Sequence, residues 1–208
     1  MAQPSHQYVT VEEYLWQEQR AEVKHDYHSG QVYNMAGGSP EHSQIAVNLT
    51  GELRALLRGS GCQVFNSDLK VAVEGNRRTK DNKRQPDDEF VTYPDASVVC
   101  GQLEFYKADR QTLANPKVLF EVLSPSTRNY DRSVKLEQYR KLPSLMAYVM
   151  IDSEKVWVEQ YHRTAQNSWQ VDAPLENIDA SLRIEILNLD LSLLALYEEV
   201  SFQDKAEY

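Results

Sequence analysis

Two acidic residues lie within or beside stretches of the sequence that otherwise read as buried strands. Glu121 interrupts the apolar run VLFEVL at positions 118–123, and Asp95 follows Pro94 at the start of a second apolar run. An ionised carboxylate in a buried strand costs several kcal/mol unless a cation or a hydrogen-bond donor compensates it. The two acids therefore predict a shared positive species, and the two candidates are a metal ion and Lys135.

A divalent metal ion is the first candidate. Neighbouring strands lie about 4.8 Å apart, so carboxylates on one face at matching heights can bind a single cation. Mg²⁺ is the expected ion and Mn²⁺ the alternative, because Mg²⁺ prefers oxygen ligands and is commonly held by one or two carboxylates, several waters and a substrate phosphate. Such an ion can polarise a phosphodiester and lower the pKa of a bound water. The alternative interpretation of Asp95 is that it caps a turn.

Lys135 is the second positive group. A lysine beside a metal would stabilise developing negative charge or position the nucleophile. Asp131, Lys135 and Tyr139 recur at steps of four on a predicted helix, so we expect the three side chains to share the face that lies on the sheet. The alternatives are a structural ion pair between Glu121 and Lys135, and a purely hydrophobic core role for Tyr139.

Three further sets of residues complete the predicted site. Asp68 would supply another metal-binding acid if its strand adjoins Asp95; otherwise it faces solvent. His42, near a helix start, would contact a substrate phosphate or hydrogen-bond a neighbouring backbone group. Nucleic-acid contacts would come from a run of cations that otherwise forms a solvated loop. The run has one intervening acid and consists of Arg77, Arg78, Lys80, Lys83 and Arg84.

The remaining patterns predict the elements that position these residues. Thr10 and Glu13 have the spacing of a capping box, which begins a short helix ending near residue 20. A hairpin follows over 23–36, and Ser39-Pro40 begins an amphipathic helix that ends before residue 60. Strands are predicted over 62–73, 90–100, 117–123, 146–151, 156–161, 169–171 and 182–186. The segment 103–113 has weak helical character. Helices are predicted over 131–142 and 190–199, and Asp190 caps the second of them.

Length and composition narrow the class of protein. The 208 residues, 41% of them hydrophobic and 25% charged, predict a single globular domain over 1–208. The net charge of -9 argues against a broad, non-specific electrostatic grip on nucleic acid. Cys62 and Cys100 predict two reduced thiols rather than a zinc site or a disulfide. The N-terminus lacks the features of a signal peptide and no segment is long and apolar enough to span a bilayer, so we expect a cytoplasmic protein without a membrane partner.

The combined pattern resembles the Uma-two family of restriction-endonuclease-like proteins, within the PD-(D/E)XK nuclease superfamily. The resemblance covers the chain from the early hairpin to the strand near residue 156, and its motif comprises His42, Pro94-Asp95, Glu121-Val122-Leu123, the turn SPST at 124–127, Asp131, Lys135 and Tyr139. It implies an α/β restriction-endonuclease-like core, a mixed β-sheet flanked by helices, with an N-terminal helix and hairpin. It also implies metal-dependent phosphodiester cleavage.

One position departs from the superfamily pattern. Leu123 stands where that pattern has a lysine two residues after the acid. The resemblance implies that the lysine has moved to the following helix, where Lys135 would reach the metal site on its long stem.

These observations lead to one main hypothesis and two alternatives. The main hypothesis is a metal-dependent endonuclease that hydrolyses phosphodiester bonds in DNA. The first alternative is a catalytically silent nuclease-fold module for binding or assembly, motivated by Leu123 and the acidic net charge. The second is hydrolysis of a different phosphoester, because the metal chemistry does not require nucleic acid. A homodimer is expected, because two sites are needed to cut both strands.

Overall fold

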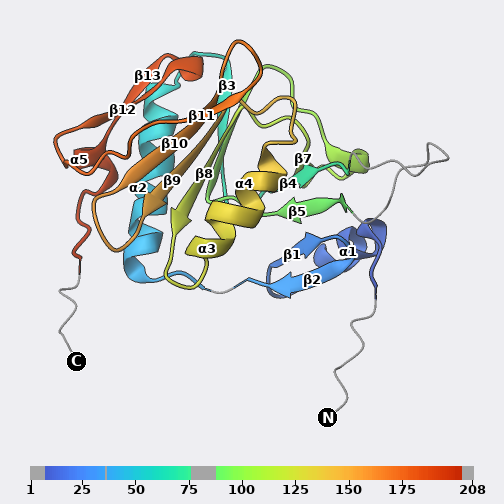
Figure 1. The fold of residues 1–208 in the computed structure, drawn as a ribbon. Coiled ribbons are helices and arrows are strands. Elements are labelled where there is room, and N and C mark those ends of the chain that lie inside the picture. The colour runs from blue at the N-terminus through green and yellow to red at the C-terminus, as the bar shows by residue number, and fades with distance from the viewer. Residues whose placement is uncertain (1–7, 36, 76–87, 203–208) are drawn as a thin grey trace, which may run out of the picture.

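A six-stranded mixed sheet forms the centre of the molecule, with helices on both of its faces (Figure 1). The computed structural model describes residues 8–35, 37–75 and 88–202. Only the β8–β9 pair is parallel among the paired strands of this sheet. In spatial order the strands are β11 (Trp169–Val171), β10 (Val158–Arg163), β9 (Ala147–Asp152), β8 (Val118–Leu123), β6 (Ala96–Cys100) and β3 (Cys62–Asn66). This mixed α/β architecture confirms the predicted fold class.

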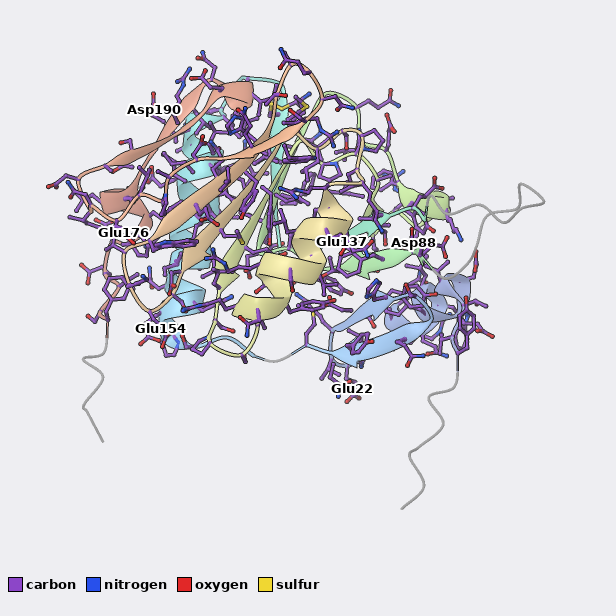
Figure 2. The ribbon with its side chains drawn as sticks, viewed as in Figure 1. Glu22, Asp88, Glu137, Glu154, Glu176 and Asp190 are labelled. Carbon is purple, nitrogen blue, oxygen red and sulfur yellow. A yellow bond between two sulfur atoms is a disulfide. The ribbon has the colours of Figure 1, made fainter. Side chains whose placement is uncertain are left out.

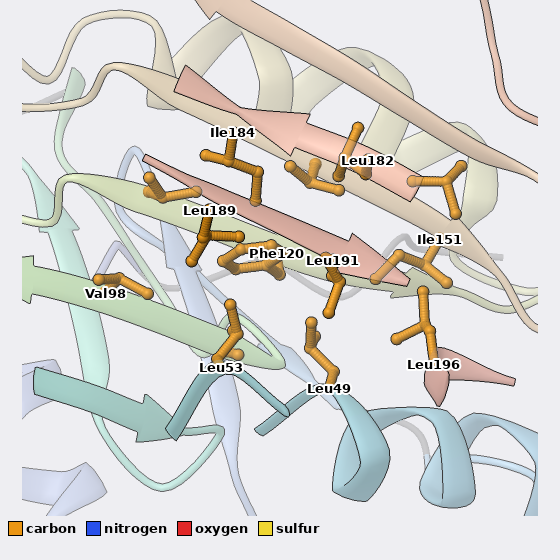
Figure 3. Close-up of a cluster of buried hydrophobic side chains, with 14 of the residues drawn as sticks. Leu49, Leu53, Val98, Phe120, Ile151, Leu182, Ile184, Leu189, Leu191 and Leu196 are labelled. Atoms are coloured by element: carbon orange, nitrogen blue, oxygen red, sulfur yellow. The ribbon is translucent and has the colours of Figure 1, made fainter. Parts of the chain in front are cut away.

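Strand β8 is buried on both faces, and its alternation decides which side chains meet which helix. Val118, Phe120 and Val122 belong to a cluster with helix α2 (Pro40–Leu56) and with the β12–β13 hairpin (Ser181–Ile184 and Leu189–Ser192). Figure 3 shows Phe120 of this cluster surrounded by leucines from α2 and from the hairpin. Leu119 and Leu123 belong to the opposite cluster, so Glu121 shares their face.

The helix on the Glu121 side runs without a break in helical backbone angles from residue 128 to 139. Its first part is α3 (Arg128–Tyr130), its middle is a π-helical turn, η3 (Asp131–Lys135), and its last part is α4 (Leu136–Tyr139). Leu136 and Tyr139 pack into the cluster under the sheet. The sequence predicted this helix three residues late.

A second sheet has the strand order β2-β1-β5-β4-β7 and lies beside the first (Figure 1). Its strands are β1 (His25–His28), β2 (Gln31–Asn34), β4 (Lys70–Val73), β5 (Phe90–Thr92) and β7 (Thr112–Leu113). The predicted strands 62–73 and 90–100 are therefore wrong as continuous units, because each one breaks and passes from one sheet to the other. The breaks fall at Asn66, whose side chain accepts the Asp68 N–H at 3.2 Å, and at Pro94, which has no N–H to donate.

The N-terminal elements follow their local sequence signals. Helix α1 (Val11–Glu18) begins with the predicted capping box, in which Thr10 and Glu13 exchange side-chain-to-backbone hydrogen bonds. The β1–β2 hairpin turns at Ser29 and Gly30, both with positive φ, which suits the right-handed twist of the strands. Ser39 caps α2 by accepting the His42 N–H. The predicted helix, hairpin and helix are confirmed.

Two other helix predictions are wrong in their bounds. Residues 189–192 form strand β13, because Leu189 and Leu191 alternate into the core, and the short helix α5 (Leu193–Leu196) begins at Ser192 instead of Asp190. The segment 103–113 contains one 3₁₀ turn (η2, Tyr106–Ala108) and strand β7. None of the helices in the described ranges combines the length and apolar composition that a membrane crossing requires.

Cys62 and Cys100 form a disulfide, which corrects the prediction of two reduced thiols. The two residues lie opposite each other in the antiparallel pairing of β3 and β6, with their Cα atoms 3.9 Å apart. They are 38 residues apart in the sequence. Their pairing depends on strand register, which cysteine spacing alone does not reveal.

Two substitutions on opposite faces of α2 test this packing. Leu49 is fully buried under the sheet, whereas Val47 is 63% exposed. We expect Leu49→Ala to lower the free energy of unfolding by about 2–5 kcal/mol, because it leaves a cavity, and Val47→Ala to change it by less than about 0.5 kcal/mol. Urea denaturation of both variants measures this difference. Equal losses would contradict the placement of α2.

Candidate active site

A buried ion pair joins the two residues that the sequence singled out. Lys135 Nζ lies 3.0 Å from Glu121 Oε2, with only 6% and 4% of the respective side chains exposed. Lys135 Nζ also lies 3.1 Å from Asp131 Oδ1, one helical turn away. The Tyr139 hydroxyl donates to Glu121 Oε1 at 2.8 Å. Asp131, Lys135 and Tyr139 thus share the inward face of the helix, and Tyr139 both packs in the core and orients the acid.

Asp95 lies at the same level of the sheet as Glu121. Strand β6 pairs with β8 so that Ala96 faces Phe120; Asp95 directly precedes Ala96, and Glu121 directly follows Phe120. The Val122 N–H donates to Asp95 Oδ2 at 2.7 Å, which anchors this carboxylate to the backbone of β8. Asp95 therefore stands beside the strand that carries Glu121, although it does not itself belong to a strand.

His42 approaches Asp95 from the first turn of α2. Its Nε2 atom lies 3.4 Å from Asp95 Oδ2. Burial lowers the pKa of His42, but the contact with Asp95 and the charges of Asp95 and Asp131 outweigh burial, so the pKa is raised overall. A Cβ atom at position 38 would lie 2.7 Å from His42 Nδ1, so Gly38 leaves the space in which the imidazole sits.

Asp26 is a member of this neighbourhood that sequence reasoning missed. It lies on β1, is 7% exposed, and its Oδ1 atom has no hydrogen-bond partner among the described residues. Burial raises the pKa of Asp26, the charge of Asp131 adds to the rise, and Lys135 opposes it. The sequence offered one signal, an acid within the predicted hairpin. Asp26 and its neighbour Tyr27 are both buried, so an alternation of buried and exposed residues along the strand could not identify Asp26 as a buried acid.

Negative charge exceeds positive charge around Lys135. We call the four carboxylates the acidic cluster: Asp26, Asp95, Glu121 and Asp131. Burial lowers the pKa of Lys135, but the charges of all four acids raise it well above its usual value, so the amine stays protonated. Burial also raises the pKa of Glu121 well above its usual value, and Asp131 and Asp95 add to the rise against the opposing effect of Lys135. The cluster therefore favours additional positive charge, either as protons or as a cation.

The chemistry of the cluster suits a hard divalent cation. All four acids offer carboxylate oxygens, the donors that Mg²⁺ and Mn²⁺ prefer. No group of three or more His, Cys, Asp or Glu residues within the described ranges is arranged to hold a metal. Mg²⁺ commonly needs only one or two protein carboxylates, with waters and substrate phosphate completing its shell. Asp95 and Glu121 fit that mode.

Other predicted site residues lie elsewhere. Asp68 is in the turn after β3, its side chain is 74% exposed, and it pairs with Lys24 at 2.7 Å, so it faces solvent and the prediction that it binds the metal with Asp95 is wrong. Leu123 is fully buried in the core, as its apolar side chain requires. The predicted nucleic-acid contacts, Arg77, Arg78, Lys80, Lys83 and Arg84, lie outside the described residues.

The acidic cluster is distinct from the acids on the surface of the molecule. Glu22, Glu137 and Glu176 are exposed and are spread over the outside of the molecule (Figure 2). Glu121 and Asp131 are 3% and 2% exposed. Solvent screens the surface acids, whereas the buried acids interact strongly with one another.

Comparison with known proteins places this geometry in context. The model of the Uma2 family, described as "Putative restriction endonuclease", matches residues 11–195. Two Synechocystis sp. proteins are similar to the chain. Uncharacterized protein slr1290 is 34% identical over 196 residues, which cover 93% of this chain and 94% of that protein. Uncharacterized protein sll1609 is 27% identical over 161 residues, which cover 77% of this chain and 84% of that protein. A crystal structure from Anabaena variabilis, titled a putative nuclease belonging to DUF820, has a TM-score of 0.65 and 18% identity, covering 91% of this chain and 97% of that one. That likeness supports the fold.

Removing the amine tests the electrostatic role of Lys135. We expect Lys135→Met to lower the free energy of unfolding by about 3–5 kcal/mol, because it leaves buried carboxylates without their cation. The matched control is Lys141→Met, since Lys141 pairs with Asp88 but is 24% exposed, and its loss should cost about 1 kcal/mol or less. Adding Glu121→Gln to Lys135→Met should recover part of the loss. Urea denaturation measures all three, and equal losses for the two lysines would refute the interpretation.

Substituting Asp26 tests the sign of its pKa shift. A carboxyl group whose pKa is raised by folding contributes its full stability below its ordinary pKa of about 4, and loses it as pH rises through the folded value. Asn does not titrate, so the stability of Asp26→Asn relative to the native protein should increase as pH rises from about 4. Lys24 and Asn66 lower the pKa of Asp68, so the relative stability of Asp68→Asn should fall as pH rises toward about 4 and stay constant above it. Chemical denaturation at several pH values in EDTA decides this; a flat difference for Asp26→Asn would count against it.

Proposed function

Because the chain belongs to the Uma2 family, described as putative restriction endonucleases, we propose that it is a metal-dependent endonuclease that hydrolyses phosphodiester bonds in DNA. The observation that carries the proposal is the 3.0 Å contact between Lys135 and Glu121, with Asp95 bound to the backbone N–H of the next residue, Val122. The superfamily pattern calls for a lysine beside the second acid, and the helix supplies an amine there although Leu123 occupies the expected position.

Each residue of the proposed site has a defined task. Asp95 and Glu121 would hold Mg²⁺ or Mn²⁺, which when bound would polarise the phosphate and lower the pKa of a water. The Val122 N–H and the Tyr139 hydroxyl fix one oxygen of each carboxylate, so each carboxylate keeps a defined orientation. Lys135 holds its proton and offers N–H donors to negative charge that develops on the phosphate.

His42 and Asp131 would assist this arrangement. A protonated His42 beside Asp95 can donate to a phosphate oxygen at the edge of the site, and its raised pKa favours that charged form. Asp131 holds the Lys135 amine from the second side. We also propose that the protein acts as a cytoplasmic homodimer, since one site per chain cuts one strand.

A second function is favoured by a specific observation. The Lys135 amine already contacts two carboxylates and is 6% exposed, so it is not free to act while Glu121 retains it. A module with this fold that binds a partner without cleaving it would keep the ion pair as a structural element. Metal binding and cleavage must therefore be measured separately.

Plasmid nicking tests the endonuclease directly. With Mg²⁺ or Mn²⁺ we expect the native protein to nick supercoiled DNA, and Asp95→Asn, Glu121→Gln and Lys135→Met each to lose about 100-fold or more in rate. Asp68→Asn is the matched control, because Asp68 is an exposed acid outside the cluster, and it should retain the native rate. Equal nicking by the native protein and the Asp95→Asn variant would exclude this site.

Calorimetric titration with Mn²⁺ separates the two functions. If the native protein binds Mn²⁺ and nicks DNA, and Asp95→Asn and Glu121→Gln lose both activities, the result supports the nuclease. The same binding without cleavage of DNA supports the silent module.

A further inference from the structure

The helix that carries Lys135 contains an extra residue in one turn. In the π-helical turn η3, the Leu136 N–H donates to the Asp131 carbonyl, five residues earlier, and the backbone angles on either side stay helical. Turns of this kind are frequent at functional sites, and an interruption of the helical hydrogen-bond ladder has an identifiable cause. The turn begins at Asp131 and ends at Lys135, the two residues of the buried ion pair.

A tyrosine from the sheet reaches this turn. The Tyr148 hydroxyl, from β9, donates to the same Asp131 carbonyl at 3.2 Å. Tyr148 is fully buried, and its ring meets the edge of the Tyr139 ring at a centroid distance of 5.2 Å. A buried tyrosine hydroxyl needs a hydrogen-bond partner, and a side chain inserted at a helix carbonyl is a known cause of local helix distortion.

The inserted hydroxyl has a consequence for the site. Tyr148 lies next to Leu119 in the β8–β9 register, so the hydroxyl ties the helix to the part of the sheet that carries Glu121. With the turn held in this position, Lys135 reaches Asp131 at 3.1 Å and Glu121 at 3.0 Å simultaneously. A regular α-helical turn would keep Asp131 and Lys135 as neighbours, but it would change the rotation of Lys135 about the helix axis and so move its amine relative to Glu121.

We propose that Tyr148 is a positioning residue, whose hydroxyl holds the π-helical turn through the Asp131 carbonyl and thereby keeps the Lys135 amine on Glu121. Only the kinetic part of its test rests on the proposed endonuclease function. The structural part applies to the protein whether or not it cleaves DNA.

The structural test follows the Lys135 ammonium by NMR in protein carrying ¹⁵N-labelled lysine. The signal is identified by its loss in Lys135→Met. Tyr148→Phe keeps the buried ring and removes only the hydroxyl, and we expect hydrogen exchange of this ammonium to accelerate about tenfold, the effect of losing one neutral hydrogen bond. Tyr161→Phe, from the neighbouring strand β10, is the control and should leave the exchange rate unchanged. An unchanged rate in a folded Tyr148→Phe protein overturns the proposal.

A second variant keeps the test decisive if Tyr148→Phe does not fold. Incorporation of p-aminophenylalanine at position 148 retains a weaker N–H donor at the same place. Where Tyr148→Phe folds, this variant should restore most of the protection that Tyr148→Phe loses. Where Tyr148→Phe does not fold, Lys135 exchange in this variant should be faster than in the native protein by less than tenfold. Exchange accelerated tenfold or more in this folded variant would overturn the proposal.

The kinetic test uses the nicking reaction. Tyr148→Phe should lower kcat about tenfold and leave KM for DNA unchanged, because Lys135 acts after the substrate is bound. An effect confined to KM would overturn the positioning role. If the native protein does not nick DNA, the proposed function fails, whereas the exchange measurement still decides whether Tyr148 positions Lys135.

Discussion

The structure around the site depends on one constraint: a single buried amine must serve several buried carboxylates. Lys135 contacts Glu121 and Asp131 directly and interacts electrostatically with Asp26 and Asp95. Ions in a protein interior lose their hydration, so each charge needs close partners with good geometry. The fold supplies them from several elements, since Tyr139 donates to Glu121, the β8 backbone donates to Asp95, and Tyr148 fixes the turn that carries the amine.

This convergence occurs where the two sheets meet. The chain leaves β5 at Thr92 and enters β6 at Ala96, and Asp95 lies in the short connection between them. The register of β1 with β5 places Tyr27 opposite Val91, so one further step brings Asp26 opposite Thr92. The β1–β2 hairpin therefore places Asp26, a residue of the second sheet, beside the connection that leads into the first sheet. Because Asp95 lies outside the regular strands, its side chain is free to accept the Val122 N–H.

The sequence revealed what depends on neighbouring residues and missed what depends on long-range register. The capping box of Thr10, the Ser39-Pro40 helix start and the apolar run around Glu121 are local signals, and each was interpreted correctly. The amine of Lys135 could be placed from helical spacing. The breaks that send 62–73 and 90–100 into two sheets could not, because apolar alternation continues across them.

The same limitation explains the residues that were misplaced or missed. Asp26 joins the acidic cluster only through the pairing of β1 with β5, and Cys62 meets Cys100 only through the pairing of β3 with β6. The strand before Asp68 does reach the start of β6, where Asn66 pairs with Ala96, but the chain turns there and the Asp68 side chain faces solvent. Leu189 and Leu191 alternate as a strand, but a four-residue strand followed at once by a short helix has the composition of a single helix.

Charge balance links the resting structure to the proposed metal. With all four carboxylates ionised and both Lys135 and His42 protonated, these six groups would carry a net charge of -2, the charge that one divalent cation would cancel. Without such an ion the acids favour protons, which is the physical meaning of the raised pKa values of Glu121 and Asp26. Metal ligands must be deprotonated, so cation binding would displace those protons. A cation at Glu121 would also compete with Lys135 for that carboxylate. The competition would release the amine, which could then donate to a phosphate oxygen.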